Sequence, residues 1–221
     1  MDVALETSHR EASVALGIGA LLFTDEFEEL DECAHASDLL PRLAGLIQRT
    51  QRGPVSGRPT LERVFAGLGP GSYTGLRVGL ASALGLARAA EARLYGLSSF
   101  EALAYGELMV GESGAVLLEA RAARYYWGEL RRAAADVEVL VKPELCRESE
   151  LPARCAAVPI LLVPERLAAT LPAGLECSTE VRRARPRADS LLALGRARIA
   201  RGGLEPVAVL EPLYLAEFGA R

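Results

Sequence analysis

The chain has 221 residues and a mass of 23.5 kDa, with 50% hydrophobic and 24% charged residues. This length fits one domain or two lobes of about 100 residues each, and the composition excludes a chain that is disordered throughout. The net charge is −4 and aromatic residues make up only 5%. Both values argue against a protein that binds nucleic acid by itself, because such proteins usually present a basic face and aromatic rings on which bases stack.

The soft metal ligands are spread along the chain without a CxxC pair. They are Cys33, Cys146, Cys155, Cys177, His9 and His35. This spacing is poor for a metal site and is typical of reduced thiols in a cytosolic protein. The first residues lack the basic and apolar regions of a leader peptide, and no apolar run approaches the ~20 residues that span a bilayer. We therefore expect a soluble, cytoplasmic protein with no membrane segment and no metal.

The first hundred residues predict three strands followed by helix, strand, helix, strand and helix. Short apolar runs separated by turn residues indicate the strands, and apolar residues at helical spacing indicate the helices. The predicted elements are strands at 3–6, 12–17 and 19–23, a loop at 25–36, a helix from Ser37, a loop at 51–60, a strand at 64–68, a helix at 72–90, a strand at 93–97 and a helix from Ser98 or Ser99.

The second half begins with the same three-strand pattern, at 115–119, 124–130 and 137–141. This recurrence predicts two lobes, residues 1–106 and 107–221, separated at the glycine-rich stretch 111–114. Residues 143–186 are rich in proline and predict only a short strand at 160–163. The last helix is expected at 188–201, and it can pack back on the first lobe.

The most unusual run is Gly69-Pro70-Gly71-Ser72-Tyr73-Thr74-Gly75-Leu76-Arg77-Val78-Gly79. A Walker A loop requires Lys and then Ser or Thr after its last glycine, and here Leu76 and Arg77 follow Gly75. A dinucleotide fingerprint requires GxGxxG, and here the third glycine comes one residue late. A tight turn from strand to helix, with Ser72 as the helix cap, fits the run.

Small residues recur every fourth position along the predicted helix, at Gly75, Gly79, Ala83 and Ala87, with Ala81 and Gly85 beside them. Such a row lets another backbone approach closely. The neighbour could be the chain's own sheet or a helix of another subunit. The spacing alone does not distinguish these alternatives.

The run from Gly69 to Gly79 resembles the signature of the TsaB (YeaZ) family. Further similar segments lie at 5–8 with 12–16, at 35–40, at 96–104 and at 212–215. The resemblance is specific over residues 1 to about 105. The chain departs from the family at Glu6 and Glu119, where aspartate is usual. Each change lengthens the carboxylate side chain.

This resemblance implies an α/β fold of the actin-like ATPase (ASKHA, ribonuclease H-like) type, with two lobes that each start with three strands. It also implies a non-catalytic subunit that binds and activates the catalytic subunit TsaD, together with the ATPase TsaE. The product of that system is N6-threonylcarbamoyladenosine in tRNAs reading codons that begin with A. ATP or ADP and metal are then expected on the partner subunits, a homodimer when the chain is alone, and tRNA contact only through the complex.

The resemblance also suggests roles for particular residues. The catalytic paralogue carries His-x-x-x-His where this chain has Ser99 and Leu103, which are poor metal ligands, so no catalytic residue is expected. Thr7 and Ser8 are the candidates for a cofactor-binding turn, because active members of the fold hold phosphate there. The predicted partner interface comprises His35, Leu39, Leu43, Gly71, Ser72, Thr74, Gly75, Leu76, Arg77, Gly79, Leu80 and Ala83.

Two alternatives stay open. The chain could be a free-standing ATP-dependent kinase, or a metal-dependent transferase or peptidase, of the same fold. It could also contact tRNA directly through the arginine-rich stretch 182–201.

Overall fold

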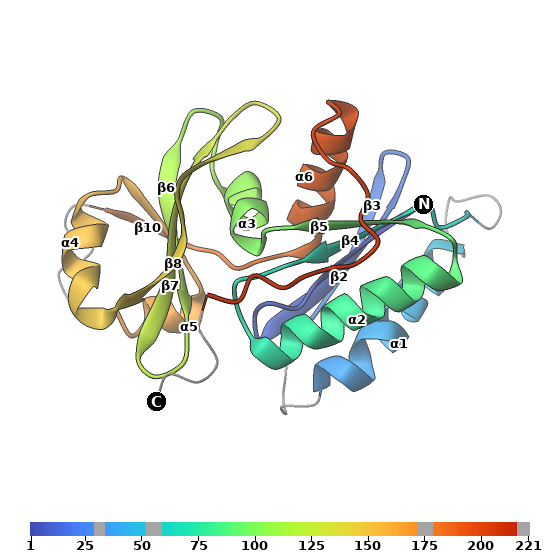
Figure 1. Ribbon diagram of the computed structural model, residues 1–221, viewed down its shortest axis with the longest axis horizontal. Helices are drawn as coiled ribbons and strands as arrows, with labels where there is room; N and C mark the ends of the chain where they lie inside the picture. The colour runs from blue at the N-terminus through green and yellow to red at the C-terminus, as the bar shows by residue number, and fades with distance from the viewer. Residues whose placement is uncertain (29–33, 52–58, 172–178, 216–221) are drawn as a thin grey trace.

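The computed structural model describes residues 1–28, 34–51, 59–171 and 179–215. Two five-stranded sheets lie side by side, and helix α3 (Ser99–Glu107) lies between them (Figure 1). Within the described residues, no helix is both long enough and apolar enough to cross a bilayer.

The first sheet has the strand order β3-β2-β1-β4-β5. Its strands are β1 (Asp2–Glu6), β2 (Glu11–Ile18), β3 (Leu21–Glu28), β4 (Arg63–Gly67) and β5 (Arg93–Leu97). The first three strands pair antiparallel, whereas β4 and β5 are parallel to β1. Every residue of β1 is buried, as expected for a central strand that is covered on both faces.

Helices cover both faces of this sheet (Figure 1). Helices α1 (Ala34–Gln51) and α2 (Tyr73–Ala89) lie on one face, and α6 (Ala188–Ala200) lies on the other. Alternation along β1 explains this arrangement, since successive side chains point to opposite faces. Val3 and Leu5 join the core under α1 and α2, whereas Ala4 joins the core under α6.

The second sheet repeats the first, with the order β10-β9-β6-β7-β8. Its strands are β6 (Ser113–Glu119), β7 (Arg124–Arg132), β8 (Val137–Arg147), β9 (Ile160–Val163) and β10 (Glu180–Arg183). Helix α3 packs on one face, and α4 (Leu151–Ala156) packs on the other. The short 3₁₀ helix η1 (Glu148–Glu150) and helix α5 (Glu165–Ala168) complete this part of the chain. The predicted recurrence of the three-strand start is therefore confirmed.

Three predicted boundaries are wrong. Strand β3 extends to Glu28 instead of ending at residue 23, and α1 begins at Ala34, inside the predicted loop. Strand β8 runs to Arg147, and α4, α5 and β10 also lie within the stretch expected to hold one strand. Pairing with β2 along its whole length holds β3 together despite its acidic composition. Strand β8 is an edge strand, which tolerates Pro143.

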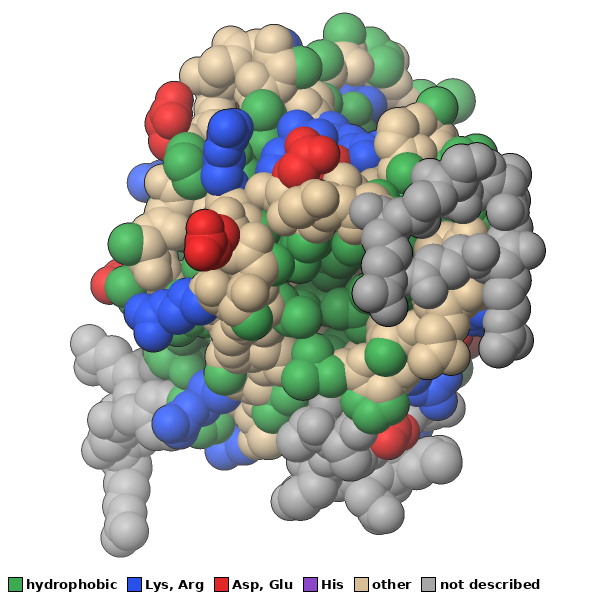
Figure 2. All heavy atoms as spheres, turned by 90° about the vertical axis from the view of Figure 1, so that its right-hand side faces the viewer, with side chains coloured by type: hydrophobic (Ala, Val, Ile, Leu, Met, Phe, Trp, Pro, Cys, Tyr) green, Lys and Arg blue, Asp and Glu red, His purple; other side chains and the backbone are tan. Residues whose placement is uncertain are grey.

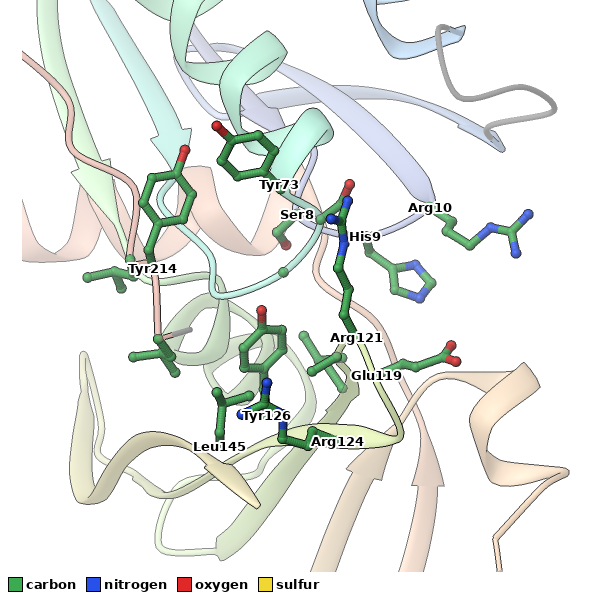
Figure 3. Close-up of a pocket in the computed structure, with 16 residues that line it drawn as sticks. Ser8, His9, Arg10, Tyr73, Glu119, Arg121, Arg124, Tyr126, Leu145 and Tyr214 are labelled. Carbon is green, nitrogen blue, oxygen red and sulfur yellow. The ribbon is translucent and has the colours of Figure 1, made fainter. Parts of the chain in front are cut away.

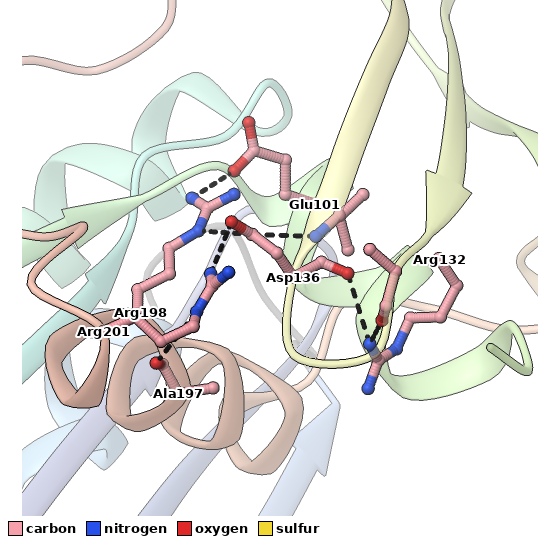
Figure 4. Close-up of polar contacts among 8 residues, drawn as sticks. Glu101, Arg132, Asp136, Ala197, Arg198 and Arg201 are labelled. Carbon is pink, nitrogen blue, oxygen red and sulfur yellow. Dashed lines mark hydrogen bonds and ion pairs between the residues drawn. The ribbon is translucent and has the colours of Figure 1, made fainter. Parts of the chain in front are cut away.

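Ion pairs at the end of α6 connect this helix, which packs on the first sheet, to the second sheet and to α3 (Figure 4). Arg198 donates to Asp136, in the turn between β7 and β8, at 2.8 Å and to Glu101 of α3 at 2.5 Å. Arg201 donates to the second oxygen of Asp136 at 2.6 Å. These contacts hold α6 against the turn between β7 and β8 of the second sheet and against α3.

Candidate functional site

A cavity of about 530 Å³ lies where four segments distant in sequence meet (Figure 3). These segments are the β1–β2 turn, the start of α2, the β6–β7 turn with parts of β7 and β8, and the C-terminal segment. Its lining residues are Ser8, His9, Arg10, Gly71, Ser72, Tyr73, Leu118, Glu119, Ala120, Arg121, Arg124, Tyr126, Leu145, Leu213, Tyr214 and Leu215. The volume is within the range of small-molecule sites, which is roughly 300–1,000 Å³.

Gly71 lets two loops at this cavity touch. A Cβ atom on Gly71 would lie 2.0 Å from the carbonyl oxygen of Ser8, so no other residue fits without a shift. The N–H of Ser72 donates to that same oxygen at 2.7 Å. The Ser72 hydroxyl in turn accepts from the N–H of Gly75 at 3.2 Å. The predicted strand-to-helix turn with a Ser72 cap is thus confirmed, and it directs the positive end of α2 toward the cavity.

The two candidates for a cofactor-binding turn face different ways. Ser8 lines the cavity, is almost wholly buried, and its hydroxyl oxygen has no hydrogen-bond partner among the described residues. Thr7 is buried against α2 instead, since a Cβ atom on Gly79 would lie 2.1 Å from its hydroxyl oxygen. Of these two residues, only Ser8 could therefore contact a ligand in the cavity.

The cavity lining has an excess of positive charge. It contains Arg10, Arg121 and Arg124, against Glu119 as the sole carboxylate of the described lining. None of the three guanidinium groups has an ion-pair partner in the described part of the chain. Arg121 extends toward Ser8 and Tyr73, whereas Arg10 points away from the cavity (Figure 3). His9 also lines the cavity, and its Nδ1 accepts from the N–H of Glu11 at 3.2 Å.

Beneath the β1–β2 turn, a carboxylate is folded into the core. Glu6 is fully buried and accepts hydrogen bonds from the N–H of Ser8 and the hydroxyl of Ser99, both at 2.8 Å. A Cβ atom on Gly67 would lie 2.2 Å from Glu6 Oε2, so a glycine makes room for the longer side chain. Burial raises the pKa of Glu6, although the hydrogen bonds from Ser8 and Ser99 oppose that shift.

Ser99 and Leu103, where the family resemblance implies the His-x-x-x-His motif of the catalytic paralogue, are both buried in this structure. Ser99 is buried and bound to Glu6, and Leu103 is buried in the core between α3 and the second sheet. Among the described residues, no three His, Cys, Asp or Glu side chains gather as a group that could hold a metal ion.

Most of the predicted interface residues are buried in the chain's own core. They are Leu39, Leu43, Gly75, Leu76, Gly79, Leu80 and Ala83. The small-residue row of α2 therefore serves close packing on the first sheet, and these side chains offer no free surface. Thr74 and Arg77 are exposed, and Gly71 and Ser72 are partly exposed. His35 belongs to α1, but its side chain lies outside the described part of the structure.

The exposed sides of α1 and α2 form a different surface, here called the outer face. It comprises Leu40, Pro41 and Ala44 of α1 with Thr74, Arg77, Ala81 and Gly85 of α2. Leu40 is 44% exposed, and nothing lies within 4 Å of a Cβ atom built on Gly85. Hydrophobic side chains also gather in a hollow at the end of the first lobe that points away from the second sheet (Figure 2). In the sequence, the small residues Ala81 and Gly85 are the feature that points to this surface, since they lie beside the buried small-residue row of α2.

Comparisons with known proteins agree with the fold and the motifs. The family model of TsaD, described as tRNA N6-adenosine threonylcarbamoyltransferase, matches residues 33–168. The tRNA threonylcarbamoyladenosine biosynthesis protein TsaB of Escherichia coli is 28% identical over 154 residues, which cover 66% of this chain and 64% of that protein. The protein of the same name from Haemophilus influenzae is 30% identical over 135 residues, which cover 59% of this chain and 53% of that protein.

The alignments thus span less than two thirds of the length of these curated relatives. The superposition on the solved structure of YeaZ from Pseudomonas aeruginosa covers a larger share of both chains. Its TM-score is 0.77 at 23% identity, over 97% of this chain and 99% of that chain. Together with the match to the TsaD family model and the two five-stranded sheets, this match confirms the predicted α/β fold of the actin-like type. The chain therefore belongs to the TsaB (YeaZ) family, within the larger group that the TsaD family model describes.

Proposed function

We propose that this chain is a non-catalytic subunit in tRNA threonylcarbamoyladenosine biosynthesis, which binds and activates a TsaD-like catalytic subunit together with a TsaE-like ATPase. The observation that carries this proposal is the hydrogen bond from Ser99 to Glu6, together with the burial of Leu103 one turn further along α3. A hydroxyl bound to a carboxylate and a buried leucine stand where two imidazole ligands would be required. The names of the Escherichia coli and Haemophilus influenzae relatives support the pathway.

The outer face supports the choice of a protein partner. Its side chains are small or apolar except for Thr74 and Arg77, so a second helix can approach closely. The Arg77 guanidinium donates to the hydroxyl of Tyr73 at 2.7 Å and lies over its ring, 5.2 Å from the ring centroid. A guanidinium held this way can bind a carboxylate of the partner. We propose that TsaD occupies this face in the complex and that a second copy occupies it when the chain is alone.

Several features of the system follow from this assignment. The nucleotide and metal needed for the transfer reaction belong to the partner subunits, and tRNA contacts this chain only within the assembled complex. The site of action is the cytoplasm.

Reconstitution of the modification reaction tests the proposal. The reaction contains tRNA, a source of threonylcarbamoyl-adenylate, TsaD and TsaE, with and without this chain, and mass spectrometry of the nucleosides measures the product. We expect product only when this chain and TsaD are both present. Equal product without the chain would overturn the proposal.

A second arm addresses the free-standing enzyme of the same fold. The purified chain is incubated with ATP and common small-molecule acceptors, without partners. We expect no turnover. Saturable hydrolysis that is lost in Ser8→Ala would favour the free-standing enzyme instead.

A further inference from the structure

Part of the outer face is one row of residues along α2, and an aromatic pair stands at the end of that row. Arg77, Ala81 and Gly85 lie four residues apart, so they share one side of the helix, and all three are exposed. Tyr73 begins the same row, and its ring packs against that of Tyr214, with the ring centroids 5.4 Å apart. We propose that Tyr214 is a positioning residue of the partner-binding surface, which holds Tyr73 and, through it, Arg77 in place for a carboxylate of the partner. This inference rests on the proposed function and adds the C-terminal segment to the surface that the partner contacts.

The Arg77 guanidinium is oriented but has no counter-ion. Its Nη1 donates to the hydroxyl of Tyr73 at 2.7 Å, and its central carbon lies 5.2 Å from the ring centroid. No carboxylate in the described part of the chain pairs with it. By contrast, each arginine of the stretch 182–201 pairs with at least one carboxylate. A guanidinium that is already held in one orientation loses less freedom on binding, so Arg77 favours a partner that presents an acidic side chain.

The place of Tyr214 is set by the segment that carries it. After α6 the chain passes along β5, the edge strand of the first sheet (Figure 1). The N–H of Val207 donates to a carbonyl of β5 and the N–H of Leu213 donates to the carbonyl of Leu68, both at 2.8 Å. Between these two bonds, Leu210 packs against the core under α1 and α2. The backbone thus brings Tyr214 to the start of α2.

This arrangement extends the outer face beyond the two helices. Tyr73 and Tyr214 lie side by side although they come from different segments (Figure 3). Tyr214 is 44% exposed, so a partner can reach it. A partner helix that lies along the row meets small side chains at Ala81 and Gly85 and then Arg77. Without Tyr214, the Tyr73 ring loses its neighbour and the guanidinium loses its fixed support.

NMR of the chain alone tests the positioning step. The Nε–H signal of Arg77, assigned with Arg77→Lys, reports how firmly the guanidinium is held beside the Tyr73 ring. We expect Tyr214→Ala to move this signal toward those of freely exposed arginines, whereas Tyr214→Phe keeps the ring and should leave the signal in place. An unchanged Arg77 signal in Tyr214→Ala would overturn the inference, whether or not TsaD binds.

Calorimetric titration of the whole chain with TsaD tests the consequence for binding. Arg77→Ala should weaken binding about 10-fold or more, since a hydrogen bond between charged groups is lost. Tyr214→Ala should weaken it about 3- to 10-fold through lost orientation of the guanidinium, and Tyr214→Phe should stay within about twofold of the unchanged chain. In the Arg77→Ala background, Tyr214→Ala should cause no further loss, because both changes act through one guanidinium.

Val209→Ala is the matched control. Val209 belongs to the same segment and is 61% exposed, but it is not part of the aromatic pair, so this variant should bind TsaD as the unchanged chain does. Unchanged TsaD affinity in Tyr214→Ala, or an undiminished further loss in the Arg77→Ala background, would overturn the inference. Failure of the unchanged chain to bind TsaD would overturn the proposed function and the binding part of the inference. The Arg77 signal decides the positioning part independently.

Discussion

The buried carboxylate of Glu6 and the hydroxyl of Ser99 are joined by a hydrogen bond of 2.8 Å. Glu6 ends β1 and Ser99 begins α3, so this one bond connects the centre of the first sheet to the helix that packs on the second. The N–H of Ser8 donates a hydrogen bond to the other carboxylate oxygen of Glu6. An ionisable group in this place should make the stability of the chain depend on pH.

The first prediction concerns the direction of that dependence. Burial raises the pKa of Glu6 above its value of 4.5 in the unfolded chain, so the native state holds the proton more tightly. The stabilisation is fully present below pH 4.5 and is lost as the pH rises through the folded pKa. The loss is about 1.4 kcal/mol for each tenfold difference in proton affinity between the native and the unfolded chain.

Glu6→Gln removes the titrating group. Urea unfolding between pH 4 and 8 should show the free energy of unfolding falling more steeply in the unchanged chain than in Glu6→Gln, and parallel pH profiles would contradict the prediction.

The second prediction compares two glycines on one helix. A Cβ atom on Gly79 would lie 2.1 Å from Thr7 Oγ1, whereas one on Gly85 meets nothing within 4 Å. Gly79→Ala should therefore lower the free energy of unfolding by about 1–3 kcal/mol through overpacking. Gly85→Ala should raise it by about 0.5–1 kcal/mol, because alanine favours the helix. Denaturant unfolding of both variants checks this, and a loss of stability in Gly85→Ala would show that the exposed side of α2 has another constraint.

The third prediction concerns the ion pairs at the end of α6. Burial alone would raise the pKa of Asp136, but hydrogen bonds from Arg201, the Val137 N–H and Arg198 outweigh it, and the pKa is lowered from 3.8. Asp136→Asn should therefore lower the free energy of unfolding at pH 7 by about 1–3 kcal/mol, since two guanidinium groups lose a charged acceptor. The difference from the unchanged chain should shrink as the pH falls below 3.8, where the aspartate of the native state becomes protonated.

Glu138→Gln is the control for that measurement. Glu138 pairs with Arg131 on the same hairpin, but both side chains are about half exposed, at 52% and 53%. Such pairs contribute about 0–1 kcal/mol. A cost in Glu138→Gln equal to that in Asp136→Asn would mean that the contact between α6 and the β7–β8 turn adds nothing beyond ordinary surface charge.

The sequence predicts local features better than distant ones. The Ser72 cap and the three antiparallel strands that begin each lobe depend on near neighbours, and both predictions hold. The end of β3 depends on pairing with β2, which no local pattern records, and this prediction fails. The spacing of the small-residue row that contains Gly79 also could not decide what the row packs against. The chain's own sheet and a helix of another subunit require the same small side chains. Arg121 and Tyr214 meet at the cavity only through the tertiary fold, although Arg121 lies two residues after the unusual Glu119.

The last prediction follows from the difference between the buried row and the outer face. Ala81 is exposed on α2, so Ala81→Glu should leave the free energy of unfolding within about 0.5 kcal/mol of the unchanged chain. If a partner helix packs on the outer face, the added carboxylate would be buried without a counter-ion, and binding of TsaD should weaken at least about 10-fold. Ala153→Glu makes the same change at an exposed position of α4, on the second lobe, and should not alter binding. Light scattering and calorimetry with TsaD measure the effect, and equal affinities for the two variants would place the partner on another surface.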